Sequence, residues 1–358
     1  MNEFDFIRQL RRQARSHTNS PRVISGIGDD AAVINESANR ELVITTDLLV
    51  EGIDFHREAT PARLLGHKAL TVSLSDIAAM GARPTWSLIS FGIPKKDWDG
   101  EFRDELFAGY LDLADRYGVA LVGGDVSKSK QIVVDSIVVG EVNSGRAVLR
   151  STARAGDQIF VTGTLGGAAA GLKLIKLGAR VRSPTVREGN DRRQDAAGRR
   201  QAANEGSSVC DDDAIQTLLL RQLAPQPRVG WGIVLGEEQL ATSMIDISDG
   251  LSSDVHHLCT ESNVGATIDA ASLPLDENVK QLCGRRKLDA LALALHGGED
   301  FELLFTVAPK DVPRLPKRVD GVPISHIGEI ASESGFVRVR EKNHEWDLRP
   351  QGFEHFAE

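Results

Sequence analysis

Apolar residues along the chain follow two different periods, and this pattern predicts an α/β (α+β) protein. Short apolar runs rich in β-branched residues, each bounded by glycine or a polar turn, predict strands. Stretches with apolar residues at helical spacing predict helices. We expect strands at residues 41–50, 86–93, 119–126, 132–142 and 158–162, and helices at 3–16, 68–81, 100–117, 214–222, 250–261 and 287–295.

The chain has 358 residues, which is long for a single hydrophobic core and predicts two domains. The pattern changes near residue 150, where a turn at 155–157 precedes a new strand. We therefore expect an N-terminal α/β domain at 1–150 and a C-terminal α/β domain at 151–358. Residues 179–213 are rich in Arg, Asp, Gln, Asn, Gly and Ser, and we expect them to form a mobile insertion.

The predicted helix at 68–81 is apolar on almost every side, yet it carries Asp76 in its middle. A helix of this kind is normally buried. A buried, unpaired carboxylate is costly, so Asp76 needs a cation or several hydrogen-bond donors. No Lys or Arg stands three or four residues away. The partner must come from elsewhere in the fold; a metal ion and a capped neighbouring loop are both candidates.

Composition and charge narrow the class of protein. The chain is 41% hydrophobic and 26% charged, as expected of an ordinary globular protein. Its net charge of −9 makes a nucleic-acid partner unfavourable. The N-terminus lacks the apolar core of a signal peptide, and no run is long enough to span a membrane. Three cysteines without metal-ligand spacing indicate a reducing compartment, so we expect a cytoplasmic protein.

Aspartates recur where apolar elements end in glycine or in a turn. Taken singly, each is explained by a turn or a helix cap. If the strands share an edge, however, the carboxylates converge and require cations. Oxygen-only ligands suit Mg²⁺, especially beside phosphates, and this favours phosphoryl transfer. The acids in question are Asp30, Asp47, Asp125, Asp246 and Asp249, with Asp76 inside a helix.

The glycine-rich turn at 163–172 has two possible interpretations, anion binding and tight helix packing. Free N–H groups at the start of a helix can bind an anion. Small residues there also permit tight helix packing. The Gly-Lys-Ser/Thr of a Walker A loop is missing, so the turn does not indicate a P-loop.

Six motifs in order resemble those of the thiamine-monophosphate kinase family. They are GIGDDAAV, TTDLLVEG, LSDIAAMGARP, GGD, ATSMIDISDGL and HGGEDFEL. The resemblance extends over nearly the whole chain outside 179–213. It implies a two-domain fold like that of aminoimidazole ribonucleotide synthetase, in which the N-terminal sheet pairs with that of a second subunit to form a β-barrel. It also implies a homodimer that binds ATP, several Mg²⁺ ions and thiamine monophosphate.

The resemblance also implies roles for individual residues. The implied metal ligands are Asp30, Thr45, Thr46, Asp47, Asp76, Asp125, Asp246 and Asp249. The implied ATP contacts are Gly124, Asp125, Arg150 and Ser248. The implied substrate contacts are Asp54, Glu299 and Phe353. Many relatives carry His where this chain has Asp54, so the contact at this position is a departure from the family pattern.

The implied reaction is direct transfer of the γ-phosphoryl group of ATP to thiamine monophosphate, which yields thiamine diphosphate. The attacking phosphate has a second pKa of about 6 and is already largely anionic at neutral pH. We therefore assign no general base and no covalent nucleophile. The alternatives are another ATP-dependent enzyme of the same superfamily, of the ring-closing synthetase or hydrogenase-maturation type, and a non-catalytic sensor of magnesium and nucleotide.

Overall fold

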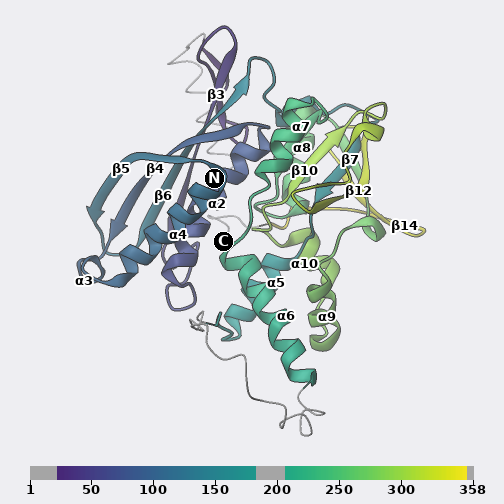
Figure 1. Ribbon diagram of the computed structural model, residues 1–358. Coiled ribbons are helices and arrows are strands. Elements are labelled where there is room, and N and C mark those ends of the chain that lie inside the picture. Colours follow the sequence, from purple (N-terminus) through teal and green to yellow (C-terminus); the bar gives the residue numbers. More distant parts are fainter. Residues whose placement is uncertain (1–21, 183–205, 353–358) are drawn as a thin grey trace, which may run out of the picture.

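The computed structural model describes residues 22–182 and 206–352, except for the side chains of 206–211. Within these ranges the chain forms two mixed β-sheets with helices packed against them (Figure 1). The predicted α/β class is therefore confirmed. The predicted helix at 3–16 and most of the predicted insertion lie outside the described residues.

The first sheet has six strands in the order β1-β2-β3-β6-β4-β5. Neighbouring strands are antiparallel except β4 and β5, which are parallel. Its strands are β1 (Val23–Ser25), β2 (Ala32–Asn35), β3 (Arg40–Val50), β4 (Arg83–Ile93), β5 (Ala120–Lys128) and β6 (Val133–Asn143).

Helices cover one face of this sheet. They are α2 (Ala62–Ala79) and α4 (Glu101–Tyr117), with the short α3 (Lys95–Trp98) at the edge. Helix α2 is buried along most of its length, as its apolar sequence predicts. It begins after Pro61, six residues earlier than predicted at 68, and it ends at Met80, where Gly81 adopts a left-handed φ of 69°.

The second sheet has the order β14-β13-β9-β12-β7-β10-β8, with β11 paired to β12. Only β9 and β13 run parallel; the other neighbours are antiparallel. Its strands are β7 (Gln158–Thr162), β8 (Ser243–Asp246), β9 (Gly265–Asp269), β10 (Leu303–Val307), β11 (Arg318–Val319), β12 (Val322–Ala331), β13 (Val337–Glu341) and β14 (His344–Asp347).

The second half also contributes most of the helices. They are α5 (Gly167–Lys176), α6 (Gly206–Leu223), α7 (Val229–Glu237), α8 (Leu251–Ser262), α9 (Glu277–Arg286) and α10 (Ala290–His296), with 3-10 turns at Arg150–Thr152, Ala270–Ser272 and Val312–Arg314. None of the helices in the described ranges is long and apolar enough to cross a membrane.

Two further predictions, of the insertion and of a helix in the second half, were wrong in their boundaries. The predicted insertion reaches residue 213, but 206–213 form the first turns of α6. Asp212, in this part of α6, is exposed and pairs with Arg182. The predicted helix at 287–295 is α10, which begins only at Ala290, after Asp289 caps it by accepting a hydrogen bond from the N–H of Ala292 at 3.0 Å.

One hydrophobic core continues between the two sheets. It joins Met80 and Val138 from the first half to Trp231 and Phe305 from the second. Helices α2 and α7 pack so closely that a Cβ atom on Gly232 would lie 2.3 Å from the carbonyl oxygen of Ala78. The division at residue 150 stays a prediction, but α2 is clearly placed between the first sheet and the elements of the second half.

Candidate active site

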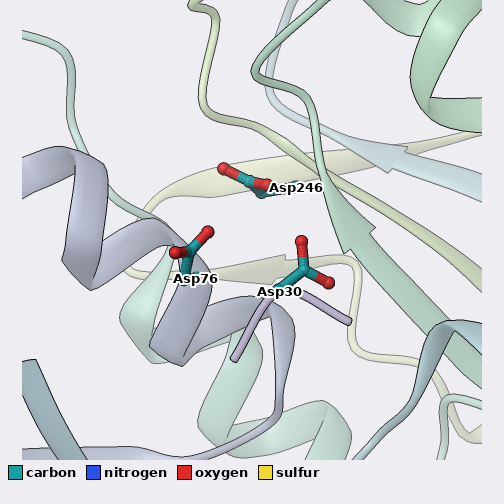
Figure 2. A group of neighbouring side chains, drawn as sticks. All are labelled: Asp30, Asp76 and Asp246. Atoms are coloured by element: carbon teal, nitrogen blue, oxygen red, sulfur yellow. The ribbon is translucent and has the colours of Figure 1, made fainter. Parts of the chain in front are cut away.

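Three aspartates from distant parts of the chain meet beside α2. Asp30 precedes β2, Asp76 lies on α2, and Asp246 ends β8. One carboxylate oxygen of each lies within 4.8 Å of the other two. Figure 2 shows the three side chains facing a common space. The structure therefore brings together three of the acids that the sequence singled out.

Each of these carboxylates has a donor from a neighbouring element. The hydroxyl of Thr45 donates to Asp76, and the hydroxyl of Ser75 donates to Asp246 at 2.6 Å. The guanidinium of Arg150 forms a bidentate pair with Asp30, in which Nε lies 2.9 Å from the carboxylate. Arg150, predicted to contact ATP, thus lies in the site and balances one of its acids.

The remaining negative charge is poorly compensated. Burial is the main cause that raises the pKa of Asp76 and of Asp246 well above the ordinary value. The neighbouring carboxylates add to the effect: Asp47 and Asp246 act on Asp76, and Asp30 acts on Asp246. Burial lowers the pKa of Arg150, but Asp30, Asp29 and Asp246 together outweigh it and raise the pKa, so the guanidinium stays charged. The site therefore favours the binding of further positive charge.

Asp47, near the end of β3, gives the clearest sign that a cation belongs here. Burial raises its pKa to about 6. Its Oδ2 is buried and has no hydrogen-bond partner among the described residues. A hard divalent cation fits this arrangement, because the ligand atoms that these aspartates offer are all carboxylate oxygens. The ion would also give the Oδ2 of Asp47 a partner.

A cavity of about 730 Å³ lies beside these acids, between the two halves of the chain. Asp47 and the 53–56 turn border it from the first half, and α5, α10 and the 297–301 loop border it from the second. Lys68 and Val72 of α2 also line it. Residues at i, i+4 and i+8 share one helix face, so Asp76 lies on the same face of α2 as the two cavity residues Lys68 and Val72.

The wall of the cavity carries an ion pair in which the lysine is buried. Lys68 Nζ lies 2.5 Å from Glu299 Oε1, and the lysine side chain is only 2% exposed. Gln222 of α6 donates from its amide nitrogen to the other oxygen of Glu299. Glu299, a predicted substrate contact, lines the cavity and is held by donors from both halves of the chain.

The two other acids of the HGGEDFEL motif point away from the cavity and hold the fold. Asp300 accepts hydrogen bonds from the backbone N–H of Gly166 at 2.6 Å and of Ala168 at 3.0 Å. The glycine-rich turn at the start of α5 therefore does bind an anion, but the anion is this carboxylate. Glu302 is fully buried and forms a bidentate pair with Arg228.

Other predicted residues lie around the same cavity. Ser248 and Asp249 line it, and so does Asp54. The carboxylate of Asp54 accepts a hydrogen bond from the backbone N–H of Val50 at 2.7 Å, so it stabilises the turn that forms this wall. Gly352 also lines the cavity, and Phe353, the next residue, lies outside the described residues.

Three predicted residues do not join the group of acids. Thr46 points to the opposite face of β3 from Thr45, where its hydroxyl donates to Asp135 on β6. Asp125 is exposed on the edge strand β5, beside Gly124. A Cβ atom on Gly124 would lie 1.9 Å from the carbonyl oxygen of Ile89, so packing alone requires this glycine. The binding roles of these three residues stay predictions.

Comparisons with known proteins identify the family of this chain. The family model described as AIR synthase related protein, N-terminal domain, matches residues 28–142, and the corresponding C-terminal domain matches 219–340. The thiamine-monophosphate kinase of Escherichia coli strain K12 is 37% identical over 93% of this chain and 92% of its own length. That of Bacillus subtilis strain 168 is 32% identical over 99% of this chain and 100% of its own. The chain belongs to the thiamine-monophosphate kinase family.

Solved structures of this family share the fold. A structure described as AaThiL complexed with AMPPCP and TMP is 30% identical, with a TM-score of 0.78 over 99% of this chain and 97% of that one. The thiamine-monophosphate kinase of Stenotrophomonas maltophilia K279a is 35% identical, with a TM-score of 0.71 over 94% and 96%. The two-domain architecture expected from the motifs is therefore confirmed.

Sequence reasoning missed Lys68 and Gln222 as residues of the site. Lys68 stands eight residues before Asp76 in the same predicted helix. This spacing indicated that both side chains lie on one helix face. Gln222 carries no local signal, since only folding brings α6 beside Glu299. Asp29 was also left without a role; it is buried beside Asp30, and burial raises its pKa to about 7.

The raised pKa values predict an unusual pH dependence of stability. The carboxyl groups of Asp29 and Asp47 have an ordinary pKa of 3.8, which the fold raises to about 7 and about 6. Between about pH 4 and 7 these two carboxyl groups bind protons in the native state that they do not bind in the unfolded state, so their contribution to stability falls as pH rises. Without divalent cations, thermal unfolding should occur at a higher temperature at pH 5.5 than at pH 7.5.

Magnesium should reverse this trend, because it binds the ionised carboxylates and stabilises the native state most at pH 7.5. An Asp47→Asn variant serves as the control and should show a shallower slope in the absence of metal. A metal-free protein whose stability increases from pH 5.5 to 7.5 would contradict the prediction.

Proposed function

We propose that this chain transfers the γ-phosphoryl group of ATP directly to the phosphate of thiamine monophosphate, in line and with Mg²⁺, and so forms thiamine diphosphate and ADP. The observation that carries the proposal is the meeting of Asp30, Asp76 and Asp246 next to Asp47, which lines the cavity between the two halves of the chain. The family supports the same reaction, because its members carry the name of this activity.

The residues that would hold Mg²⁺ are Asp30, Asp47, Asp76 and Asp246, with Asp249 beside them at the cavity wall. Bound Mg²⁺ would neutralise the charge of the two phosphate groups that must approach each other. Neighbouring side chains of the protein fix the positions of these acids. Thr45 and Ser75 orient two of them, and Arg150 aligns Asp30 through a bidentate pair.

The acceptor needs no base from the protein, since a phosphate monoester is already largely anionic near neutrality. The chain therefore acts by binding and alignment. The cavity, bordered by Leu49, Phe55, Leu293 and Phe301, offers an apolar space for the rings of the substrate and excludes water from them. We place the acceptor phosphate toward Asp47 and the rings toward Glu299.

The direct test is incubation of the protein with ATP, Mg²⁺ and thiamine monophosphate, followed by chromatography of the products. We expect thiamine diphosphate and ADP in equal amounts, and loss of both when EDTA is added. A protein that binds ATP but forms no thiamine diphosphate would instead fit the non-catalytic sensor.

We also propose a cytoplasmic homodimer in which the first sheet pairs with that of a second copy to form a β-barrel. Helices α2 and α4 cover the face on which Val138 and Phe91 are buried. The strand register places Thr46, Ile137 and Leu88 side by side on the opposite face. Leu48 and Trp86, which follow the same alternation, are 56% and 40% exposed. An apolar sheet face of this kind is typical of an interface.

An Ile137→Lys substitution should therefore shift the protein from dimer to monomer, because a charged side chain would be buried in the middle of an apolar interface. Light scattering coupled to gel filtration measures the change. Leu111→Lys, on the solvent side of α4, is the matched control and should leave the mass unchanged. A wild-type protein that is monomeric at micromolar concentration would refute the dimer.

A further inference from the structure

Gln222 is a buried residue of the cavity that has one unused hydrogen-bonding atom. Its side chain is 4% exposed and lines the cavity. Its amide nitrogen donates to Glu299. Its amide oxygen is buried and has no partner among the described residues. A buried acceptor without a donor is rare in native proteins and points to a missing partner.

The orientation of this amide follows from its surroundings. Glu299 is a carboxylate and accepts hydrogen bonds only, so the atom of Gln222 that faces it must be the NH₂ group. The reverse orientation would place two acceptors against each other. The unpaired atom is therefore an acceptor, and the group that satisfies it must carry an N–H or O–H.

Glu299, which lies beside Gln222 in the cavity wall, can also accept hydrogen bonds. Glu299 uses one oxygen for Lys68 and the other for Gln222, and a carboxylate has capacity for about two more. The two acceptors thus lie together, one of them charged. A ligand group with two N–H donors, such as an aromatic amine, matches this arrangement better than a hydroxyl group, which has one.

The distance between the acceptors and the group of acids agrees with a two-ring phosphate ester. Lys68, which pairs with Glu299, and Asp76, which belongs to the group of acids, are eight residues apart on α2. At 1.5 Å of rise per residue the separation along the axis is about 12 Å. An extended molecule with an aminopyrimidine at one end and a phosphate at the other fits this span.

We infer that Gln222 is a specificity-determining residue, whose amide oxygen accepts a hydrogen bond from the exocyclic amine of an aminopyrimidine substrate. The inference rests on the proposed function, because it assumes that thiamine monophosphate occupies the cavity. Glu299 lies within reach of the same amine, and Lys68 holds Glu299 in place. The chain thereby distinguishes an amine from an oxo group at this position of the ring.

The test compares thiamine monophosphate with the analogue in which an oxo group replaces the exocyclic amine. The wild-type protein should prefer the amine in kcat/KM, since the oxo group would face two acceptors. In Gln222→Met, a close match in length without hydrogen-bonding atoms, kcat/KM for thiamine monophosphate should fall about tenfold to a hundredfold, chiefly through KM. The value for the oxo analogue should change much less, so the preference shrinks by the same factor.

Gln216→Met, on the same helix and away from the cavity, is the control and should keep the wild-type preference. An unchanged preference in a folded Gln222→Met protein would overturn the inference. Equal use of both substrates by the wild type would overturn it as well, and that measurement needs no variant. If the wild type forms no thiamine diphosphate at all, the proposed function itself fails, which the first assay shows separately.

Discussion

An Asp76→Asn variant should lose about a thousandfold or more in kcat and yet unfold at a higher temperature than the wild type without metal. The loss follows from removing one of the carboxylates that would hold Mg²⁺ between the two phosphates. The gain follows from removing one of several buried like charges, since burial and the neighbouring acids already disfavour the ionised form of Asp76. The amide oxygen of Asn can still accept from Thr45.

Two measurements check this prediction together. A coupled assay of ADP release gives kcat, and thermal unfolding with and without Mg²⁺ gives the stability and its dependence on metal. The stabilisation by Mg²⁺ should be much smaller in the variant. Asp115→Asn, an exposed acid on α4, removes the same charge far from the site and should change neither quantity. Near-normal turnover in Asp76→Asn would exclude Asp76 from the metal ligands.

A Glu302→Gln variant should lose about 3–5 kcal/mol of unfolding free energy, the usual cost of a buried charge left without its partner. Glu302 is fully buried, and the side chain of Arg228, its bidentate partner, is only 10% exposed. The same carboxylate also accepts a hydrogen bond from the hydroxyl of Thr162 at 2.7 Å and lies near Arg221. Its loss would loosen β10, α6 and the start of α7 together.

Urea unfolding at pH 7.5 measures this cost. The matched control is Glu237→Gln, because the pair of Glu237 with Arg83 is exposed and should contribute almost nothing. A Glu302→Gln protein within about 1 kcal/mol of the wild type would show that the pair is not needed for stability.

The cost should also depend on pH. Burial opposes the ionised form of Glu302, but the two arginines outweigh it and lower its pKa. The carboxylate therefore contributes stability above its unfolded value of 4.5, and this contribution is lost as pH falls through the lower folded pKa. The difference between variant and wild type should shrink in strongly acidic buffer.

The sequence alone determined the α/β class and singled out most of the acids that meet at the site. Asp76 was recognisable because a helix that is apolar on all sides has no local partner for a carboxylate. Asp30, Asp47 and Asp246 were recognisable because each ends or adjoins an apolar strand. These are properties of neighbouring residues, so the order of residues is enough to reveal them.

Only the tertiary structure decided which acids meet and what the others do. Of the three acids in HGGEDFEL, Glu299 lines the cavity, Asp300 caps α5 and Glu302 neutralises Arg228. Gln222 and Lys68 reach Glu299 from segments far away in the chain. The physical reason is that a side chain's role depends on the charges and donors around it, and packing of distant elements sets those surroundings.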